Sequence, residues 1–448
     1  MTGATSATLD RMHSRPYRGW VLGLLLVISM FGFIDRQIIS AVAQPMKRQL
    51  GLSDTEIGVL GGLAFGVLNS LIGLPLARLA ERFSRVAIYG IGVFLWSIAT
   101  CACGLAGSFG QLLLARIGVG VGEATQPAVS SLMADYYPRD KRTTAAAIYV
   151  LAVPAGALIG QAGGGFIAQH WDWRWTFVAA GAPGALLALL LFLTVREPVR
   201  GRYDPPAAAG DPTPPFSAVL RRMVQRPSYL HVLMGSTLAS MGGFGINVFL
   251  AAYLVRRFGL DYGQSGLLSG LISAIPGTIS MLGAGLLADR LGRRDPRFYA
   301  WVPGIGSLLA GPLYIAAFLQ GGWPAATALL MLTGLVQYAY MAPSIGVYQN
   351  VMEPRMRATS GAVVGIFTNL IASGVGPFMV GALSDSFARR AFGGDFATAC
   401  HAGAGARGAC LEASATGLQW AFVITALLYL WSAAHFALAG RTIARDMA

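Results

Sequence analysis

Two pairs of charged residues lie within long apolar stretches of this sequence. Asp35 and Arg36 stand side by side in FGFIDRQIISAV (31–42), and Arg116 and Glu123 lie seven residues apart in another apolar stretch. Charges at hydrocarbon depth are costly, so they are expected to face one another or a wet cavity and to mark a functional pathway. Carboxylates there could exchange protons, and arginines could bind an anion.

The spacing of these residues allows all four to share one site. Arg116 and Glu123 are two helical turns apart, so they lie on one helix face, about 10 Å apart along the axis. If the first apolar stretch runs outward and the fourth runs inward, Asp35 comes level with the segment between them. Asp35 and Arg36 point about 100° apart on their own helix, so they must contact different partners. We expect Asp35 and Glu123 to exchange a proton while Arg36 and Arg116 contact an anion.

Charge balance connects the proton with the anion. With both carboxylates ionised the cluster is neutral, and one added proton leaves a surplus positive charge that can hold an anionic group. Loss of water favours a neutral carboxyl group and a nearby arginine favours the charged one, so proton binding depends on hydration and on the substrate. In an alternative interpretation, two ion pairs only hold two helices together. Buried pairs seldom add net stability over packed apolar residues, which favours a functional role.

The composition indicates a membrane protein. The 448 residues are 55% hydrophobic and 12% charged, with a mean hydropathy of +0.58, whereas about a quarter of the residues in soluble domains are charged. About twelve apolar stretches recur from Gly19 onward, each long enough to cross a hydrocarbon core of roughly 30 Å as a helix. The first has no small-residue cleavage site, so we expect a span and not a signal peptide.

The basic residues alternate between the two sides of the predicted spans. The net charge is +13, but the arginines form short clusters and no continuous face, which argues against a nucleic-acid partner. Most clusters fall on the side of the N-terminus, and few basic residues, among them Lys47 and Arg256, fall in loops on the other side. The positive-inside rule therefore predicts that both termini are cytoplasmic. The preference for arginine and alanine suggests a bacterial protein, and hence the inner membrane.

A polar interruption near the middle divides the chain. Two motifs recur in both halves: ARLAERFSR (77–85) matches GLLADRLGRR (285–294), and YYPRDKRTTA (136–145) matches MEPRMRATSG (352–361). Such duplication is typical of transporters built from two helical repeats with the substrate site between them. We predict an all-α membrane protein with twelve transmembrane helices in two pseudo-symmetric six-helix bundles. The expected segments are a tail (1–18), a first bundle (19–196), a cytoplasmic linker (197–226), a second bundle (227–440) with an outer loop (384–416), and a tail (441–448).

These motifs also carry a family resemblance. Together with RIGVGVGEA (116–124) and PAGALIGQAGGG (154–165), they resemble the signature loops and helices of the major facilitator superfamily. FIDRQIISAVAQPMKRQLGLSDTEIGVLGGLAFG and RIGVGVGEATQPAVSSLMADYYPRDKR are similar to the spinster family of lipid-related transporters. The resemblance implies the major facilitator fold, with roles in proton coupling and head-group binding for Asp35, Arg36, Arg116 and Glu123.

The spans of the second half carry no charge at hydrocarbon depth. They offer mildly polar residues, and the predicted substrate contacts among them are Asn247, Tyr338, Tyr340, Thr368 and Asn369. Each of these could instead serve only an interhelical hydrogen bond. A cavity charged on one wall and largely apolar on the other suits an amphipathic substrate. We predict a proton-coupled transporter of an anionic lipid-like molecule, such as a lysophospholipid or a sphingoid phosphate, with small organic anions or drugs as the alternative.

The repeated motif also predicts a gate. Its acids can accept hydrogen bonds from arginines across the interface when the cytoplasmic side closes. The expected gate residues are Glu81, Arg82, Asp289 and Arg290.

The remaining expectations concern cysteines and cofactors. Cys400 and Cys410 share the expected outer loop, where they could form a disulfide or stay free. No nucleophile, nucleotide-binding loop or metal-binding motif accompanies the charged cluster, so we expect no enzyme activity, cofactor or metal. The expected partners are protons, an amphipathic substrate and membrane lipids, acting on a monomer.

Overall fold

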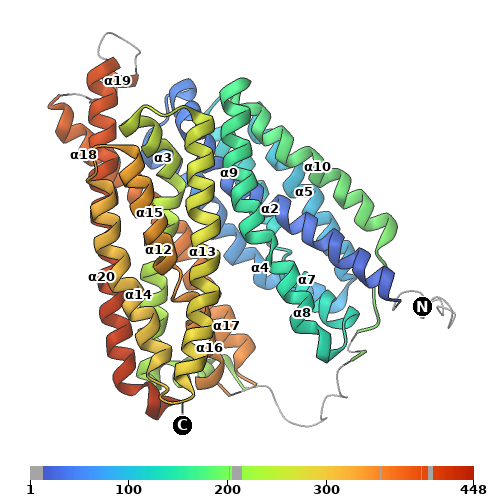
Figure 1. The fold of residues 1–448 in the computed structure, drawn as a ribbon. Coiled ribbons are helices and arrows are strands. Elements are labelled where there is room, and N and C mark those ends of the chain that lie inside the picture. The colour runs from blue at the N-terminus through green and yellow to red at the C-terminus, as the bar shows by residue number, and fades with distance from the viewer. Residues whose placement is uncertain are drawn as a thin grey trace.

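The computed structural model describes residues 14–200, 202–203, 214–353, 355–394, 396–401 and 407–447. This described part is almost entirely helical and contains no β-strand. The helices fall into two groups along the chain, which lie side by side with the blue-to-green first half on one side and the yellow-to-red second half on the other (Figure 1).

The first half contains six spans, three of them built from more than one helix. They are α2 (Arg15–Leu50); α3 (Asp54–Gly58), π-helix η1 (Val59–Leu63) and α4 (Ala64–Arg82); α5 (Arg85–Leu105); α6 (Phe109–Glu123) and α7 (Pro127–Tyr136); α8 (Arg139–Val150) and α9 (Ala152–His170); and α10 (Trp173–Thr194). Local sequence fixes several starts, because the side chains of Ser53, Ser84 and Ser108 each accept a backbone hydrogen bond from the first turn that follows.

The second half repeats this arrangement after the short helix α11 (Phe216–Gln225). Its spans are α12 (Pro227–Phe258); α13 (Tyr262–Gly292); α14 (Phe298–Phe318); α15 (Trp323–Gln337) and α16 (Met341–Val351); α17 (Arg357–Ile366), π-helix η2 (Phe367–Val375) and α18 (Gly376–Phe392); and α20 (Arg407–Asp446), preceded by the short α19 (Phe396–His401). Eleven of the described segments are long and apolar enough to cross a membrane. The twelfth span is α6 with α7, which a turn interrupts directly after Glu123. The chain is thus a multi-pass membrane protein with twelve helical spans.

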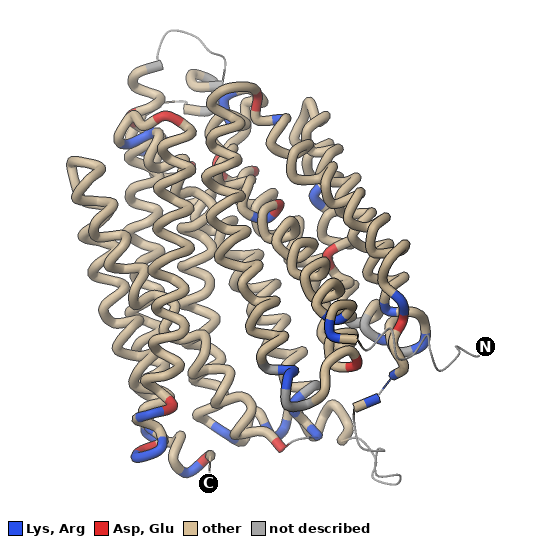
Figure 2. Tube along the Cα trace, turned by 45° about the vertical axis from the view of Figure 1, so that its right-hand side comes forward, with Lys and Arg blue, Asp and Glu red and all other residues tan. Residues whose placement is uncertain are grey.

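The two ends of the molecule differ. At one end, here named the linker end, Tyr17 near the start of α2 donates a hydrogen bond to the Thr194 carbonyl at the end of α10, 2.9 Å away. At the same end the Asp446 carboxylate accepts a 3.0 Å bond from the backbone of Ser228 at the start of α12. The opposite end is named the far end. Figure 2 shows that basic segments gather mainly toward the linker end.

The halves pack through their second and fifth spans. On one side η1 crosses η2, and a Cβ atom on Gly62 would lie 2.6 Å from the Gly374 carbonyl oxygen. On the other side α9 crosses α13, and a Cβ atom on Gly165 would overlap the Tyr262 carbonyl oxygen. Such close backbone contact requires glycine. The glycines spaced every fourth residue on α9, at 156, 160 and 164, pack instead mainly on α2 within the first half.

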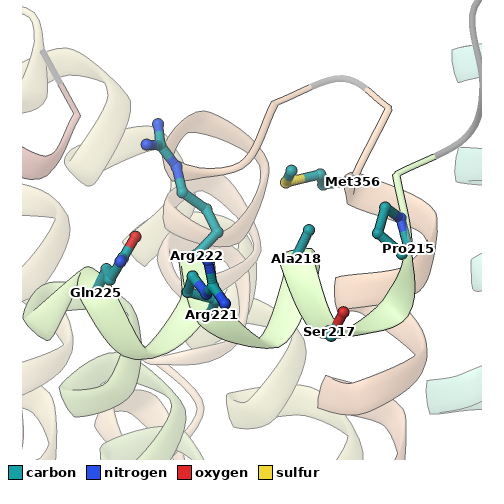
Figure 3. Close-up of a pocket in the computed structure, with 7 residues that line it drawn as sticks. All are labelled: Pro215, Ser217, Ala218, Arg221, Arg222, Gln225 and Met356. Atoms are coloured by element: carbon teal, nitrogen blue, oxygen red, sulfur yellow. The ribbon is translucent and has the colours of Figure 1, made fainter.

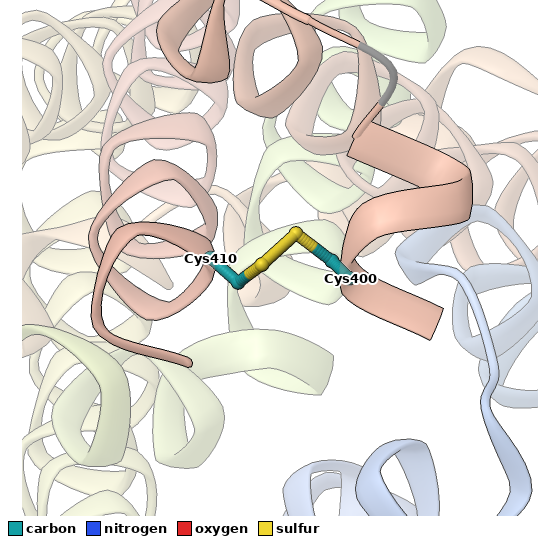
Figure 4. The surroundings of a disulfide bond; sticks show 2 residues. All are labelled: Cys400 and Cys410. Atoms are coloured by element: carbon teal, nitrogen blue, oxygen red, sulfur yellow. A yellow bond between two sulfur atoms is a disulfide. The ribbon is translucent and has the colours of Figure 1, made fainter. Parts of the chain in front are cut away.

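Several segments expected to be irregular are helical. The expected linker contains α11, and the expected loop 384–416 holds the end of α18, all of α19 and the start of α20. The helix α20 also continues through most of the expected tail 441–448, and Asp446 at its end caps the start of α12. A disulfide joins Cys400 of α19 to Cys410 of α20 (Figure 4). From the sequence alone, a loop at the end of a span could not be distinguished from an extension of the helix.

The close packing of α9 on α13 generates a prediction with a matched control. Gly165→Ala places a methyl group against the partner backbone, whereas a Cβ atom on Gly163 meets nothing within 4 Å. Gly165→Ala should therefore disfavour this arrangement of the halves, and Gly163→Ala should not. Spin labels at the far-end turns, positions 107 and 321, would report longer distances for Gly165→Ala. Identical distance distributions for the two variants would contradict this packing argument.

Candidate functional site

The charged residues of the first and fourth spans form two buried ion pairs. Asp35 accepts a 2.9 Å bond from Nη1 of Arg116 on α6 and a 2.8 Å bond from the Thr100 hydroxyl on α5. Asp35 and Arg116 are both fully buried. Nε of Arg116 has no partner among the described residues. This pair holds α2, α5 and α6 together and leaves one unused donor.

The second pair is more accessible. Nε of Arg36 donates a 2.6 Å bond to Oε2 of Glu123, and Arg36 also forms a salt bridge with this carboxylate. The Glu123 side chain is buried, but the Arg36 side chain is 31% exposed. The guanidinium lies over the rings of Phe33 and Phe65, at 5.1 and 4.7 Å, in cation–π geometry. The structure thus brings the four predicted residues together as two ion pairs. Asp35 and Arg36 point in different directions from α2, so each contacts a different residue of α6.

Glu123 has a further feature that the sequence did not reveal. Its Oε1 atom is buried and has no hydrogen-bond partner among the described residues. The helix α6 ends at this residue, and the chain turns through 124–126 before α7 begins. An ionised carboxylate oxygen is a hydrogen-bond acceptor only, and a protonated one becomes a donor. Here the unpaired atom belongs to a carboxylate that can bind a proton.

A chain of amides connects this region with the second half. Gln161 on α9 donates to Gln37, the neighbour of Arg36, over 2.9 Å, and to Oδ1 of Asn247 on α12 over 3.4 Å. Asn247 donates to the Ser273 hydroxyl over 2.8 Å, and its carbonyl accepts a 2.7 Å bond from Ser40. Asn247, predicted as a substrate contact, therefore links the two halves beside the charged cluster.

The other predicted residues of the second half contact partners outside the ion pairs. The Tyr340 hydroxyl pairs with Ser240 over 2.7 Å, and Thr368 of η2 donates to a carbonyl of the preceding helix α17. Tyr338 lies at the break between α15 and α16 and packs against Gly277, while the Asn369 carbonyl faces Gly66 of α4. Within the described part of the chain, no hydrogen bond joins these four residues to the charged cluster.

The predicted gate is not assembled in this conformation. Asp289 accepts a 2.9 Å bond from Tyr299 of its own half, and Arg82 and Arg290 are exposed. The side chain of Glu81 lies outside the described residues. The expected bonds across the interface are therefore not made by the described members, because the halves meet at the far end instead.

The contact at the far end is an ion network that the sequence did not predict. Asp54 at the start of α3 accepts two bonds from Arg256 at the end of α12, 2.7 and 2.8 Å long, and a 2.6 Å bond from Lys47. Ser384 of α18 donates to the same carboxylate over 2.6 Å. Asp385 accepts bonds from the backbone of Asp54 and from the backbone and hydroxyl of the next residue. We name these five residues, Lys47, Asp54, Arg256, Ser384 and Asp385, the far-end lock.

Two of its members, Lys47 and Arg256, were expected in loops on the side opposite the N-terminus. The structure instead places both in the last turns of helices, and Arg256 is only 4% exposed. A cation at a span end looks solvated in a sequence, and only the partner half shows that it is buried. The SDTE segment did carry one signal, since Ser53 and Glu56 form a capping box at the start of α3.

Comparison with known proteins defines the class of transporter to which this chain belongs. Residues 25–377 match the Major Facilitator Superfamily, and the chain belongs to this superfamily of membrane transporters. The crystal structure of a bacterial homologue of the human lysosomal transporter spinster, inward-facing and unoccupied, is 33% identical, with a TM-score of 0.87 and coverage of 97% of this chain and 99% of that one.

Two relatives extend the comparison. An MFS-type efflux pump of Mycolicibacterium smegmatis (strain ATCC 700084 / mc(2)155) is 34% identical over 86% of this chain and 89% of its own length. A sphingosine-1-phosphate transporter of Danio rerio, SPNS2, is 22% identical over 81% of this chain and 75% of its own. The protein is a spinster-like transporter of the superfamily and not an enzyme.

The buried Asp35–Arg116 pair generates a stability prediction. Arg116→Gln leaves the Asp35 carboxylate buried without its cation, which should cost about 3–5 kcal/mol of folding stability. Adding Asp35→Asn removes that unpaired charge and should recover much of the loss. Thermal unfolding of purified protein in detergent measures both effects. Additive losses in the double variant would show that the two side chains do not interact.

The far-end lock generates a conformational prediction. Asp54→Asn leaves Lys47 and Arg256 close together without their shared carboxylate, so the far end should open. The spin-label pair at positions 107 and 321 should then report longer distances. Asp261→Asn is the matched control, because Asp261 is an exposed helix-capping acid at the same end. Equal distances in both variants would exclude the lock as the closing element.

Proposed function

We propose that this transporter couples proton movement to the transport of an amphipathic, anionic lipid-like substrate, of the lysophospholipid or sphingoid phosphate type, by alternating access. The observation that carries the proposal is the Arg36–Glu123 pair. It combines a buried carboxylate that has one free oxygen with an arginine that is partly exposed. We further propose a bacterial inner membrane location with both termini cytoplasmic, which the positive-inside pattern supports.

Competition for Arg36 would couple the proton to the substrate. An anionic head group that binds Arg36 competes with Glu123 for the guanidinium. A buried carboxylate that loses its cation is more stable once it has taken up a proton. The anion and the proton therefore favour each other's binding, and Oε1 of Glu123 can receive the proton without breaking another hydrogen bond.

The other pair supplies the second acid and the second arginine. We assign Asp35 to proton coupling as well, although both of its oxygens accept hydrogen bonds and would have to rearrange first. Nε of Arg116 has no hydrogen-bond partner in the described part of the chain and could donate to the same head group. Proton exchange at Glu123 is thus the more direct step.

An amphipathic substrate suits the surroundings of the charges. Arg36 lies over Phe33 and Phe65, so an anion bound there meets aromatic surface at once. The second half contributes Asn247, Tyr338, Tyr340, Thr368 and Asn369, which we propose as contacts for the less polar part. The name of the zebrafish relative, a sphingosine-1-phosphate transporter, supports a lipid-like cargo.

Alternating access would use the two ends in turn. In the proposed topology the far-end lock closes the outer side, while Arg82, Asp289 and Arg290 of the inner gate are apart. This arrangement corresponds to an inward-facing state, the state named for the crystallised bacterial homologue. The return step would require the lock to open and the gate residues, Glu81 among them, to meet.

A second candidate function is proton-coupled export of small organic anions or drugs. The efflux-pump relative, which is 34% identical, favours it. The same charged cluster would serve, but the substrate would lack a long acyl chain. Export of a fluorescent drug from vesicles, with and without lysophospholipid, separates the two proposals. Strong competition by the lysolipid supports the lipid-like cargo, and drug export without competition supports the alternative.

The coupling proposal is tested by uptake into proteoliposomes across an imposed pH gradient. Wild-type protein should accumulate lysophospholipid only with the gradient, and Glu123→Gln and Asp35→Asn should lose this gradient-driven component. Glu412→Gln is a control that removes an exposed carboxylate outside the cluster. Transport that stays gradient-dependent in Glu123→Gln and Asp35→Asn would refute the assignment.

A further inference from the structure

The short helix α11 has features that neither the fold nor the proposed transport mechanism requires. It begins after Pro215 and ends at Gln225, so one residue separates it from Pro227, where the first span of the second half starts. Val219 and Met223, one turn apart, are buried and anchor the helix to the protein. The helix therefore lies at the linker end, at the level where the spans emerge from the membrane.

The outer side of α11 carries an unusual apolar row. Phe216, Leu220 and Val224 follow one another at intervals of four residues and are 58%, 37% and 64% exposed. Intervals of four residues place the three side chains on one helix face. An exposed apolar row outside the spans, beside a polar face, is typical of a helix that lies in the membrane interface.

A basic pocket adjoins this row. The pocket has a volume of about 360 Å³ and is lined by Ser217, Arg221, Arg222 and Gln225 of α11 and by Met356 before α17 (Figure 3). Its described lining contains two arginines and no carboxylate. Arg222 forms a 3.9 Å salt bridge with the largely exposed Glu353, and its Nε atom is buried without a hydrogen-bond partner among the described residues. The pocket therefore offers positive charge and unused donors.

We propose that α11 and this pocket bind an anionic phospholipid of the adjacent membrane leaflet. The lipid phosphate would lie against Arg221 and Arg222, which suit phosphate because guanidinium groups donate paired hydrogen bonds. The apolar row would contact the acyl boundary. Charge complementarity selects an anionic lipid over phosphatidylcholine, whose head group has no net charge. The site is separate from the charged cluster of α2 and α6.

Native mass spectrometry of the full-length protein tests the proposal, with phosphatidylglycerol and phosphatidylcholine as probes. The wild-type protein should retain phosphatidylglycerol in preference to phosphatidylcholine. Arg221→Gln/Arg222→Gln should weaken that binding about 30-fold, which is about 2 kcal/mol at 1.4 kcal/mol per tenfold, since each arginine near an anionic surface contributes about 1 kcal/mol. The matched control is Arg293→Gln/Arg294→Gln, which removes two exposed arginines from the α13–α14 turn at the same end.

Two further variants keep the test decisive if the arginine variant folds poorly. Leu220→Ser/Val224→Ser removes the exposed apolar row and should also weaken phosphatidylglycerol retention, while Arg221→Lys/Arg222→Lys should keep part of it. An equal loss in the α11 and control variants would show non-specific attraction to surface charge and overturn the proposal. Unchanged binding in all variants, or equal retention of both lipids by wild type, would overturn it as well.

Discussion

The constraint on which this structure depends is the need to neutralise charge inside a low-dielectric membrane. Asp35 and Arg36 stand in the middle of a 36-residue helix, where water cannot solvate both of them. Each has a partner of opposite charge on α6, so the first and fourth spans must lie together at that depth. Ion pairs of this kind are poor sources of net stability. Their presence is better explained by a functional role that requires charged groups, such as binding an anion or transferring a proton.

The same constraint acts where the halves meet. Asp54 pairs with Lys47 of its own half and with Arg256 of the other half, and the bond to Arg256 persists only while the far end is closed. Opening that end would expose them to water, which can replace the lost partners. The cluster around Glu123 and the far-end lock are thus two sets of charges with different roles. In the proposed mechanism the first set responds to substrate and proton, and the second set responds to the position of the halves.

The sequence predicted the fold and the grouping of the four charged residues, because apolar spans and the charges within them can be recognised from residue type alone. Apolar stretches of membrane length predicted the spans, and charges within them stood out at Asp35 and Glu123. The far-end lock was hidden because Arg256 and Lys47 occupy span ends, where charges are usually solvated. The gate residues could not be judged from sequence, since their contacts depend on which conformation the halves adopt. Helix extensions such as the last turns of α20 were missed because their contacts join distant segments: Asp446 of α20 caps the start of α12.

In the proposed mechanism an anion and Glu123 compete for Arg36, and a measurement of proton uptake on substrate binding tests this competition most directly. Purified protein in weakly buffered detergent solution, with a pH-sensitive dye, is mixed with lysophospholipid near neutral pH. Wild type should take up protons as the substrate binds, and Glu123→Gln should bind the substrate with little or no proton uptake. Substrate binding without proton uptake in the wild type, or undiminished uptake in Glu123→Gln, would contradict the central claim.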